Sequence, residues 1–136
     1  MTSPPGFRTE VLDALGPAGV LTDPERTAAH GVDWTGRFRA APPVGGGPRS
    51  GAEVAAVVAA ARRHGVALVP QGGNTGLVGG ATPLDGEVVL DCRGLGGEVE
   101  VDALGGQVTA PAGATAAEVA AAAAAAGWAY GVDWAA

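Results

Sequence analysis

The segment from Gly72 to Gly80 constrains the fold of this chain more than any other, because five of its nine residues are glycine. It follows Val66–Val69, a short apolar run that begins after Gly65 and predicts a buried strand. Glycine allows a backbone to adopt positive φ and to approach a ligand closely, and successive N–H groups can then form an anion-binding concavity. The segment has no charged side chain, so backbone dipoles would bind the anion, and a diphosphate fits this description.

Two well-known phosphate-binding loops do not match this segment. A Walker loop ends in Gly-Lys-Ser/Thr, and the sequence contains no lysine. A dinucleotide-binding turn of the Rossmann type has the spacing G-x-G-x-x-G and leads directly into a helix. Here the spacing from Gly73 is G-x-x-G-x-x-G, and residues 82–86 predict a turn. On the glycines alone, a surface hairpin without a ligand is an alternative.

Helix and strand signals lie on both sides of the glycine-rich segment. Asp23-Pro24 predicts a helix start, because an acidic N-cap precedes a proline at the first helical position. Ser50 with Glu53, and Thr115 with Glu118, have the spacing of capping boxes. We therefore expect helices over residues 7–15, 23–30, 52–64 and 115–127, and strands over 40–44, 66–69, 87–91, 98–102 and 107–111. The last two strands form a predicted hairpin. This order indicates an α+β fold with mixed strand pairing.

Charge and composition exclude several classes of protein. The 136 residues correspond to one domain or less, with eight arginines against fourteen acidic residues and a net charge of −6. This balance argues against nucleic acid or an anionic membrane surface as a partner. Cys92 is the only cysteine, which excludes an internal disulfide and a cysteine-rich metal site. The N-terminus has no signal-peptide core and Ala120–Ala126 is too short to span a bilayer, so we expect a cytoplasmic protein.

The run from Pro70 to Gly80 resembles the pyrophosphate-binding loop of FAD-linked oxidases of the vanillyl-alcohol oxidase / p-cresol methylhydroxylase superfamily. The resemblance is strongest to the branch that contains the D-type subunit of glycolate oxidase, D-lactate dehydrogenase and D-2-hydroxyglutarate dehydrogenase. It implies FAD as the cofactor, with its diphosphate in contact with this loop. Residues 111–115 also resemble this family, more weakly. The implied cofactor-binding residues are Pro70, Gln71, Gly72, Gly73, Asn74, Thr75, Gly76, Leu77, Gly79 and Gly80.

The segment from Asp33 to Phe38 resembles the D-W-x-G-R-Y/F stretch that precedes the flavin domain of the same branch. Two interpretations of this segment stay open: it lies near the cofactor, or it is an aromatic anchor that ties the N-terminal arm to the core. His64 lies in the last turn of a predicted helix, where a structural role is expected. Neither His64 nor His30 lies in a motif of the family. Cys92 follows a predicted buried strand, so an inert thiol and non-covalent FAD are expected.

The resemblance implies the first subdomain of a p-cresol methylhydroxylase-type FAD-binding domain, a small sheet with flanking helices, plus the start of the second subdomain. We expect an N-terminal helical arm over residues 1–38 and the partial FAD-binding domain over 39–136, with FAD between the two subdomains. The implied function is the FAD-binding, N-terminal part of an oxidoreductase that converts a D-2-hydroxy acid (glycolate, D-lactate or D-2-hydroxyglutarate) to the 2-oxo acid.

The sequence stops before a second glycine-rich segment and a cap domain that the family would place next. We therefore expect no catalytic residue and no metal ligand in these 136 residues, and an exposed apolar face that promotes self-association. Whether the chain itself is an enzyme stays open. The alternative is a non-enzymatic module that binds a flavin or another nucleotide.

Overall fold

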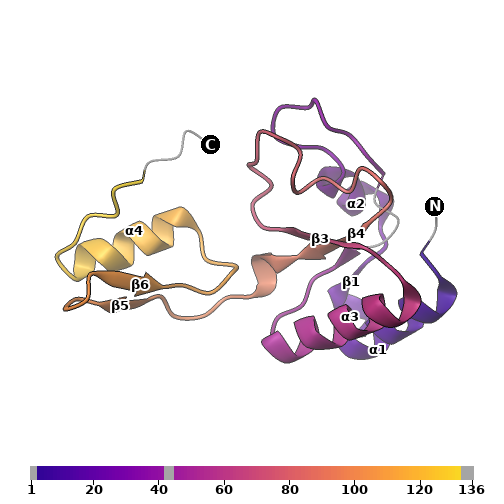
Figure 1. The fold of residues 1–136 in the computed structure, drawn as a ribbon, viewed down its shortest axis with the longest axis horizontal. Helices are drawn as coiled ribbons and strands as arrows, with labels where there is room; N and C mark the ends of the chain where they lie inside the picture. The colour runs from indigo at the N-terminus through magenta and orange to yellow at the C-terminus, as the bar shows by residue number, and fades with distance from the viewer. Residues whose placement is uncertain (1–2, 42–44, 133–136) are drawn as a thin grey trace.

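A computed structural model describes residues 3–41 and 45–132 of the chain, and it combines helices with two small sheets (Figure 1). This arrangement confirms the predicted α+β class. In chain order the elements are α1 (Pro5–Gly19), β1 (Val20–Leu21), α2 (Pro24–His30), β2 (Gly45–Gly46), α3 (Gly51–His64), β3 (Leu68–Gln71), β4 (Val88–Asp91), the short 3-10 helix η1 (Cys92–Gly94), β5 (Glu100–Asp102), β6 (Gln107–Thr109) and α4 (Ala116–Ala125).

The larger sheet has the strand order β1-β2-β4-β3, and its pairing is mixed as the sequence predicted. β4 runs parallel to both of its neighbours, whereas β1 is antiparallel to β2. All four residues of β4 are buried, which explains their nearly continuous apolar run. β3 lies at the edge of this sheet, and only Gln71 in it is buried.

The prediction of a buried strand over residues 66–69 was therefore wrong in both place and burial. The strand begins at Leu68 and extends through Pro70 to Gln71, and its first three residues are half-buried or exposed. Proline has no N–H group to donate to a neighbouring strand, so an edge strand is the position in a sheet that tolerates it. The apolar run alone did not distinguish an edge strand from a central one.

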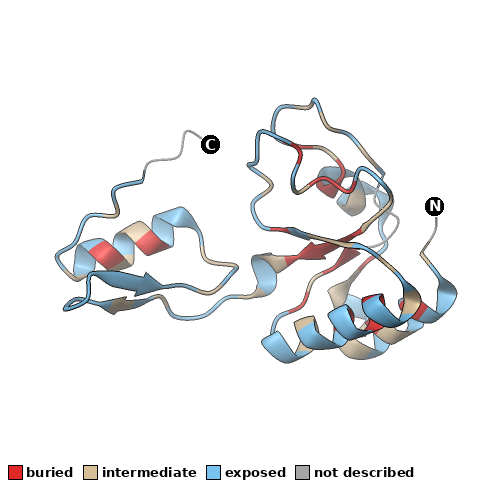
Figure 2. Ribbon diagram, in the orientation of Figure 1, coloured by how far each residue is buried: buried red, intermediate tan, exposed pale blue. Residues whose placement is uncertain are grey.

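The main core lies where α1 and α3 pack side by side against one face of the larger sheet (Figures 1 and 2). The α2 helix and the glycine loop lie on the other side of the strands. The N-terminal arm is thus built into the same core as the sheet, while the division into residues 1–38 and 39–136 stays a prediction. The core cluster consists of Phe7, Val11, Val57, Ala60, Ala61, Val88 and Leu90.

The helix ends follow the local signals in the sequence. Gly16 has φ +67° and interrupts α1 just before Pro17, where the sequence predicted the helix to stop. The α3 helix begins after Ser50, whose hydroxyl accepts a hydrogen bond from the Glu53 N–H at 3.2 Å. The Glu53 carboxylate binds the N–H of Arg49 instead of that of Ser50, so only half of the predicted capping box forms. Gly65, at φ +64°, ends α3.

The smaller sheet is the predicted hairpin, in which β5 and β6 are antiparallel. Together with α4 it forms a second unit, to the side of the larger sheet in Figure 1. Thr115 and Glu118 form a complete capping box at the start of α4, as predicted. The two units meet closely at Gly113, whose N–H donates to the Leu95 carbonyl at 2.9 Å. A Cβ on Gly113 would lie 2.8 Å from the carbonyl oxygens of Cys92 and Arg93.

Two further expectations need correction. No strand forms at Ala40 and Ala41, and the rest of the predicted strand, residues 42–44, lies outside the described residues. The strand that pairs with β1 is instead Gly45–Gly46, where a Cβ on Gly45 would lie 2.9 Å from Leu21 Cδ1. Strand pairing here needs the missing side chain, which a search for apolar residues overlooks. Cys92 is half-buried in η1 rather than fully buried. Among the helices that the structure describes, none is both long and apolar enough to cross a membrane.

Candidate functional site

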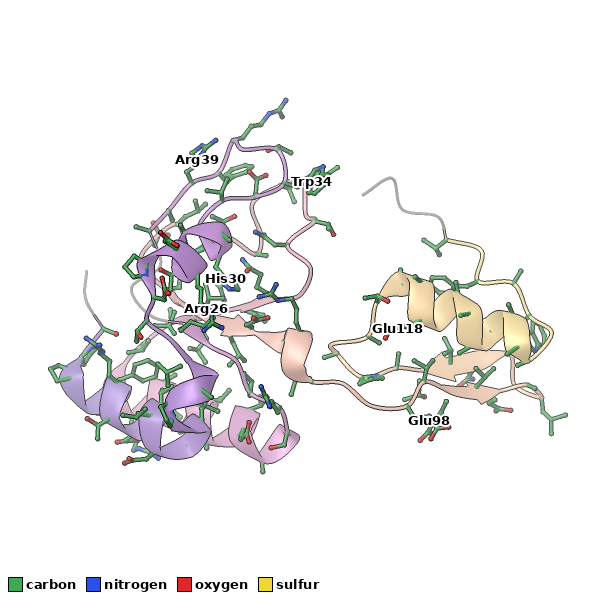
Figure 3. The ribbon with its side chains drawn as sticks, turned by 180° about the vertical axis from the view of Figure 1, so that it is seen from behind. Arg26, His30, Trp34, Arg39, Glu98 and Glu118 are labelled. Atoms are coloured by element: carbon green, nitrogen blue, oxygen red, sulfur yellow. The ribbon has the colours of Figure 1, made fainter. Side chains whose placement is uncertain are left out.

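The candidate site lies at the carboxyl ends of two parallel strands. Gln71 at the end of β3 is paired in register with Asp91 at the end of β4. In open sheets with parallel strands, ligands bind outside this edge. A cavity of about 450 Å³ lies here, between α2, the segment after it and the glycine loop (Figure 3). Its lining consists of Arg26, Ala29, His30, Val32, Asp33, Trp34, Gln71, Gly72, Gly73, Asn74 and Arg93.

Gln71 is almost completely buried and connects the glycine loop to α2. Its amide nitrogen donates to the carbonyl oxygens of His30, at 3.1 Å, and Ala81, at 2.9 Å. Because both partners can only accept, these bonds fix the orientation of the amide, and its oxygen faces His30 Nδ1 at 2.5 Å. His30 Nδ1 therefore carries a proton, and all polar atoms of the Gln71 side chain have protein partners.

Asn74 connects the same two segments from the middle of the loop. It has φ +56°, a left-handed conformation that asparagine adopts more readily than most residues. Its side-chain nitrogen donates to the Val32 carbonyl at 2.7 Å and, more weakly, to the Ala29 carbonyl at 3.3 Å. The amide groups of Gln71 and Asn74 thus position the loop from the protein side.

The glycines of the loop fall into two groups. An added Cβ on Gly72, Gly76 or Gly80 would meet nothing within 4 Å, so the backbone there is open to an approaching ligand. Gly79 is different, because it has φ +74° and its Cβ would lie 2.6 Å from Phe38 Cγ. Gly79 is thus required by the packing of Phe38.

The ten predicted cofactor-binding residues do not all reach the cavity. Gln71, Gly72, Gly73 and Asn74 line it, and the two amide side chains among them are bonded to α2 and the segment after it. The remaining six, Pro70, Thr75, Gly76, Leu77, Gly79 and Gly80, are not among its lining residues. Their assignment to the cofactor stays a prediction.

Two arginines line the cavity, although the loop itself is uncharged. Arg93 follows β4 and makes two hydrogen bonds to the Asp91 carboxylate, Nε to Oδ1 at 2.9 Å and one terminal nitrogen to Oδ2 at 2.7 Å. Burial alone would raise the pKa of Asp91, but the bonds from Arg93 outweigh it and hold that pKa below its ordinary value. Asp91 in turn raises the pKa of Arg93. Arg93 is thus a fixed cation beside the glycine loop.

Sequence reasoning missed Arg26, His30 and Arg93 as residues of the site. Arg93 had a usable signal, because it comes two residues after a predicted strand, at the edge where ligands bind in such sheets. Arg26 and His30 had none, since their position depends on how α2 packs. His30 Nε2 lies 3.4 Å from a terminal nitrogen of Arg93 and 4.0 Å from Asp91 Oδ2, at the base of the cavity (Figure 3).

The segment after α2 presents its aromatic residues differently from the anchor interpretation. Trp34 is 63% exposed and lines the cavity, whereas Phe38 is half-buried against Gly79. Phe38 therefore connects this segment to the glycine loop, and Trp34 lies at the cavity. The buried Asp33 carboxylate accepts hydrogen bonds from Thr35 Oγ1 at 2.7 Å and from the Phe38 N–H at 3.1 Å. Burial would raise the pKa of Asp33, but these bonds lower it below its ordinary value.

The remaining candidate residues lie apart from the cavity. His64 contacts Glu10 at 3.0 Å and the edge of the Phe7 ring, which agrees with a structural role. Cys92 is not among the lining residues, and its thiol lies 3.5 Å from the Leu90 carbonyl. Within residues 3–41 and 45–132, no group of three or more His, Cys, Asp or Glu side chains could hold a metal ion.

The arrangement suits an anionic ligand of moderate size. The cavity volume falls in the range of about 300–1,000 Å³ that is usual for small-molecule sites. Open glycine backbone and two guanidinium groups provide N–H donors and positive charge, the chemistry that binds phosphates. The protein residues present therefore fit a diphosphate.

Comparison with known proteins agrees with this chemistry. Residues 47–136, more than half of the chain, match the family described as "FAD binding domain". The chain is 36% identical over 99 residues to a probable mitochondrial D-2-hydroxyglutarate dehydrogenase from Oryza sativa subsp. indica, which covers 73% of this chain and 18% of the relative. It thus spans about a fifth of the length of this relative.

Solved structures show the same fold. An alkyldihydroxyacetonephosphate synthase superposes with a TM-score of 0.76 at 22% identity, over 90% of this chain and 27% of the other. The p-cresol methylhydroxylase with substrate bound superposes with a TM-score of 0.62 at 20% identity, over 71% of this chain and 20% of that enzyme. The chain therefore belongs to the FAD-binding domain family of FAD-linked oxidoreductases and has the p-cresol methylhydroxylase-type fold.

Proposed function

We propose that the cavity beside Gly72 and Gly73 holds the diphosphate of non-covalently bound FAD, in a protein that oxidises a D-2-hydroxy acid. The observation that carries the proposal is the open glycine backbone at a cavity that also has Arg26 and Arg93 in its lining. Backbone N–H groups bind the phosphate oxygens, and the arginines offset their negative charge. When bound, FAD supplies the acceptor for the hydride of the substrate.

Each protein group has a distinct part in this site. Asp91 holds Arg93 through two of its guanidinium nitrogens, so the cation keeps its position without a ligand. Gln71 and Asn74 fix the loop to α2 and the segment after it, which leaves the glycine N–H groups directed toward the ligand. A site that is organised before binding loses less conformational entropy when the cofactor arrives.

Support for the substrate class comes from the named relative, a probable D-2-hydroxyglutarate dehydrogenase. We extend that class to this chain as D-2-hydroxyglutarate or a similar D-2-hydroxy acid. In the described residues no side chain is assigned to proton abstraction, and the chain covers 18% of the relative. The oxidation is therefore proposed for the whole protein that contains this segment.

The cofactor proposal is tested with Gly72→Val and the matched control Gly96→Val. Both positions are open, so the added side chain clashes with nothing in the folded chain, but only Gly72 lines the cavity. We expect Gly72→Val to lose FAD binding in a fluorescence titration, while Gly96→Val binds like the unsubstituted chain. Acid precipitation of the loaded chain should leave the flavin in the supernatant. Full FAD occupancy in Gly72→Val would remove the loop from the site.

The substrate proposal is tested in the protein translated from its full reading frame. We expect dye reduction with D-2-hydroxyglutarate, D-lactate or glycolate, and no reduction with the L-enantiomers of the chiral acids. FAD binding without turnover on any of these acids would contradict the substrate class but leave the cofactor site intact, and would favour a non-enzymatic flavin-binding module.

A further inference from the structure

Trp34 is a large aromatic residue that the proposed diphosphate site does not use. Its side chain is 63% exposed, and it lines the cavity together with Gly72, Gly73 and Arg26. Figure 3 shows it on the segment after α2, at the side of the molecule that carries the glycine loop. An indole group in contact with water loses the burial that usually stabilises an aromatic side chain.

The backbone around Trp34 is held firmly on both sides. The preceding residue, Asp33, is buried and binds Thr35 and Phe38 through its carboxylate. Its carbonyl accepts the Gly36 N–H at 3.0 Å, and Val32 forms an isolated β-bridge with Arg39. The exposed indole thus stands on a braced turn and not on an unsupported loop end.

The same brace joins Trp34 to the loop that holds the proposed diphosphate. Asn74 donates to the Val32 carbonyl at 2.7 Å, and Phe38 packs on Gly79. Trp34 and the glycine loop therefore keep a fixed relation to each other. A dinucleotide carries a planar ring within a few bonds of its diphosphate, and an aromatic face beside a phosphate site is a stacking surface for such a ring.

We propose that Trp34 stacks on a planar heteroaromatic ring of the bound dinucleotide and so determines its affinity for the site. The inference rests on the proposed function, because it takes Gly72 and Gly73 as the diphosphate position. The ring is either adenine or isoalloxazine, two parts of the same molecule with the same stacking chemistry. Stacking would cover the exposed indole face and exclude water from that side of the cavity.

The experiment compares Trp34→Ala and Trp34→Phe with the matched control Trp128→Phe. Trp128 is also partly exposed, but its ring lies near Gly106 in the second unit and not at the cavity. We expect Trp34→Ala to weaken FAD binding about tenfold, the size typical of one lost stacking partner, and Trp34→Phe to restore most of it. Trp128→Phe should bind FAD like the unsubstituted chain. Circular dichroism should be unchanged in all three, because Trp34 is not a core residue.

Two further readouts separate stacking from a general effect on the site. FAD should quench the fluorescence of Trp34, measured as the difference between the unsubstituted chain and Trp34→Phe. Titration with ADP and with FMN identifies the ring: a loss for ADP only indicates adenine, and a loss for FMN only indicates isoalloxazine. Equal FAD affinity in Trp34→Ala and the unsubstituted chain would overturn the inference, while a loss in Gly72→Val would still support the cofactor site. Absence of FAD binding in the unsubstituted chain would overturn both.

Discussion

At the scale of single residues, the site depends on polar side chains that point away from the ligand. Gln71 and Asn74 belong to the segment that the sequence assigned to the cofactor, yet their amides bind backbone carbonyls of α2 and the segment after it. Each substitutes for a hydrogen bond that an irregular loop cannot make within itself. Their contribution to cofactor binding is therefore indirect, through the position of the glycine backbone.

Replacing Gln71 tests this indirect role. Gln71→Leu keeps a similar volume but removes the partners of His30 Nδ1 and of the carbonyls of His30 and Ala81. Each buried polar group that loses its partner costs about 1–3 kcal/mol, so we expect the free energy of unfolding to fall by roughly 3 kcal/mol in urea denaturation. The control is Gln107→Leu in β6, where the side chain is exposed and a change below about 0.5 kcal/mol is expected. Equal stability of both variants would contradict the role.

The ion pair between Asp91 and Arg93 predicts a pH dependence. Because the folded state lowers the pKa of Asp91, the carboxylate stabilises the fold fully above its ordinary value of 3.8. This stabilisation is lost as the pH falls through the lower pKa of the folded state. We expect the free energy of unfolding to decrease as the pH falls below 4, and Asp91→Asn to reduce that decrease. Asp13→Asn, an exposed carboxylate on α1, is the control and should retain the pH dependence.

At the scale of elements, the contact between η1 and the turn before α4 joins the two units. Gly113 is required there, since its Cβ would lie 2.8 Å from two carbonyl oxygens, which are backbone atoms that move only with their chain. We expect Gly113→Ala to destabilise the protein by about 1–3 kcal/mol, the usual cost of inserting an extra carbon into packed structure. Gly96→Ala, in the same connection but in open space, should have little effect. Thermal unfolding followed by circular dichroism measures both variants.

The sequence predicted the elements whose signals are local. Ser50, Asp23 and Thr115 mark helix starts because a short polar side chain caps the first N–H groups, and the structure confirms all three. The hairpin of β5 and β6 follows from the turn residues between its strands. What the sequence could not show was the strand at Gly45–Gly46, because its pairing depends on the close approach of Leu21 and not on any apolar pattern.

The same distinction applies to the site. The glycine loop is a continuous segment, so the sequence identified it directly. Arg26, His30 and Trp34 reach the cavity only because α2 and the segment after it pack over the ends of β3 and β4. The interpretation of the aromatic segment as an anchor proved correct for Phe38 but not for Trp34, because the exposure of a tryptophan depends on which side of a turn it lies.

At the scale of the whole molecule, burial is distributed unequally between the two units (Figure 2). The larger sheet and its helices contain the core cluster, with Phe7 and Val89 completely buried. In the second unit no residue of β5 or β6 is buried, and α4 contributes Val119 and Ala123. Apolar burial supplies most of the free energy of folding, so the second unit has the weaker stabilisation of the two.

This inequality predicts that the second unit opens without unfolding the first. Local opening is easiest where few apolar contacts hold the hydrogen-bonded backbone together, and the β5–β6 ladder meets that description. In native-state hydrogen exchange, we expect the amides of the β5–β6 ladder and of α4 to exchange with a lower opening free energy than those of the β3–β4 ladder. Low concentrations of denaturant should leave this difference in place, because the openings of the second unit expose little surface. If both ladders exchanged with the same free energy and the same denaturant dependence, the two units would unfold together, and the contact at Gly113 would be stronger than their burial indicates.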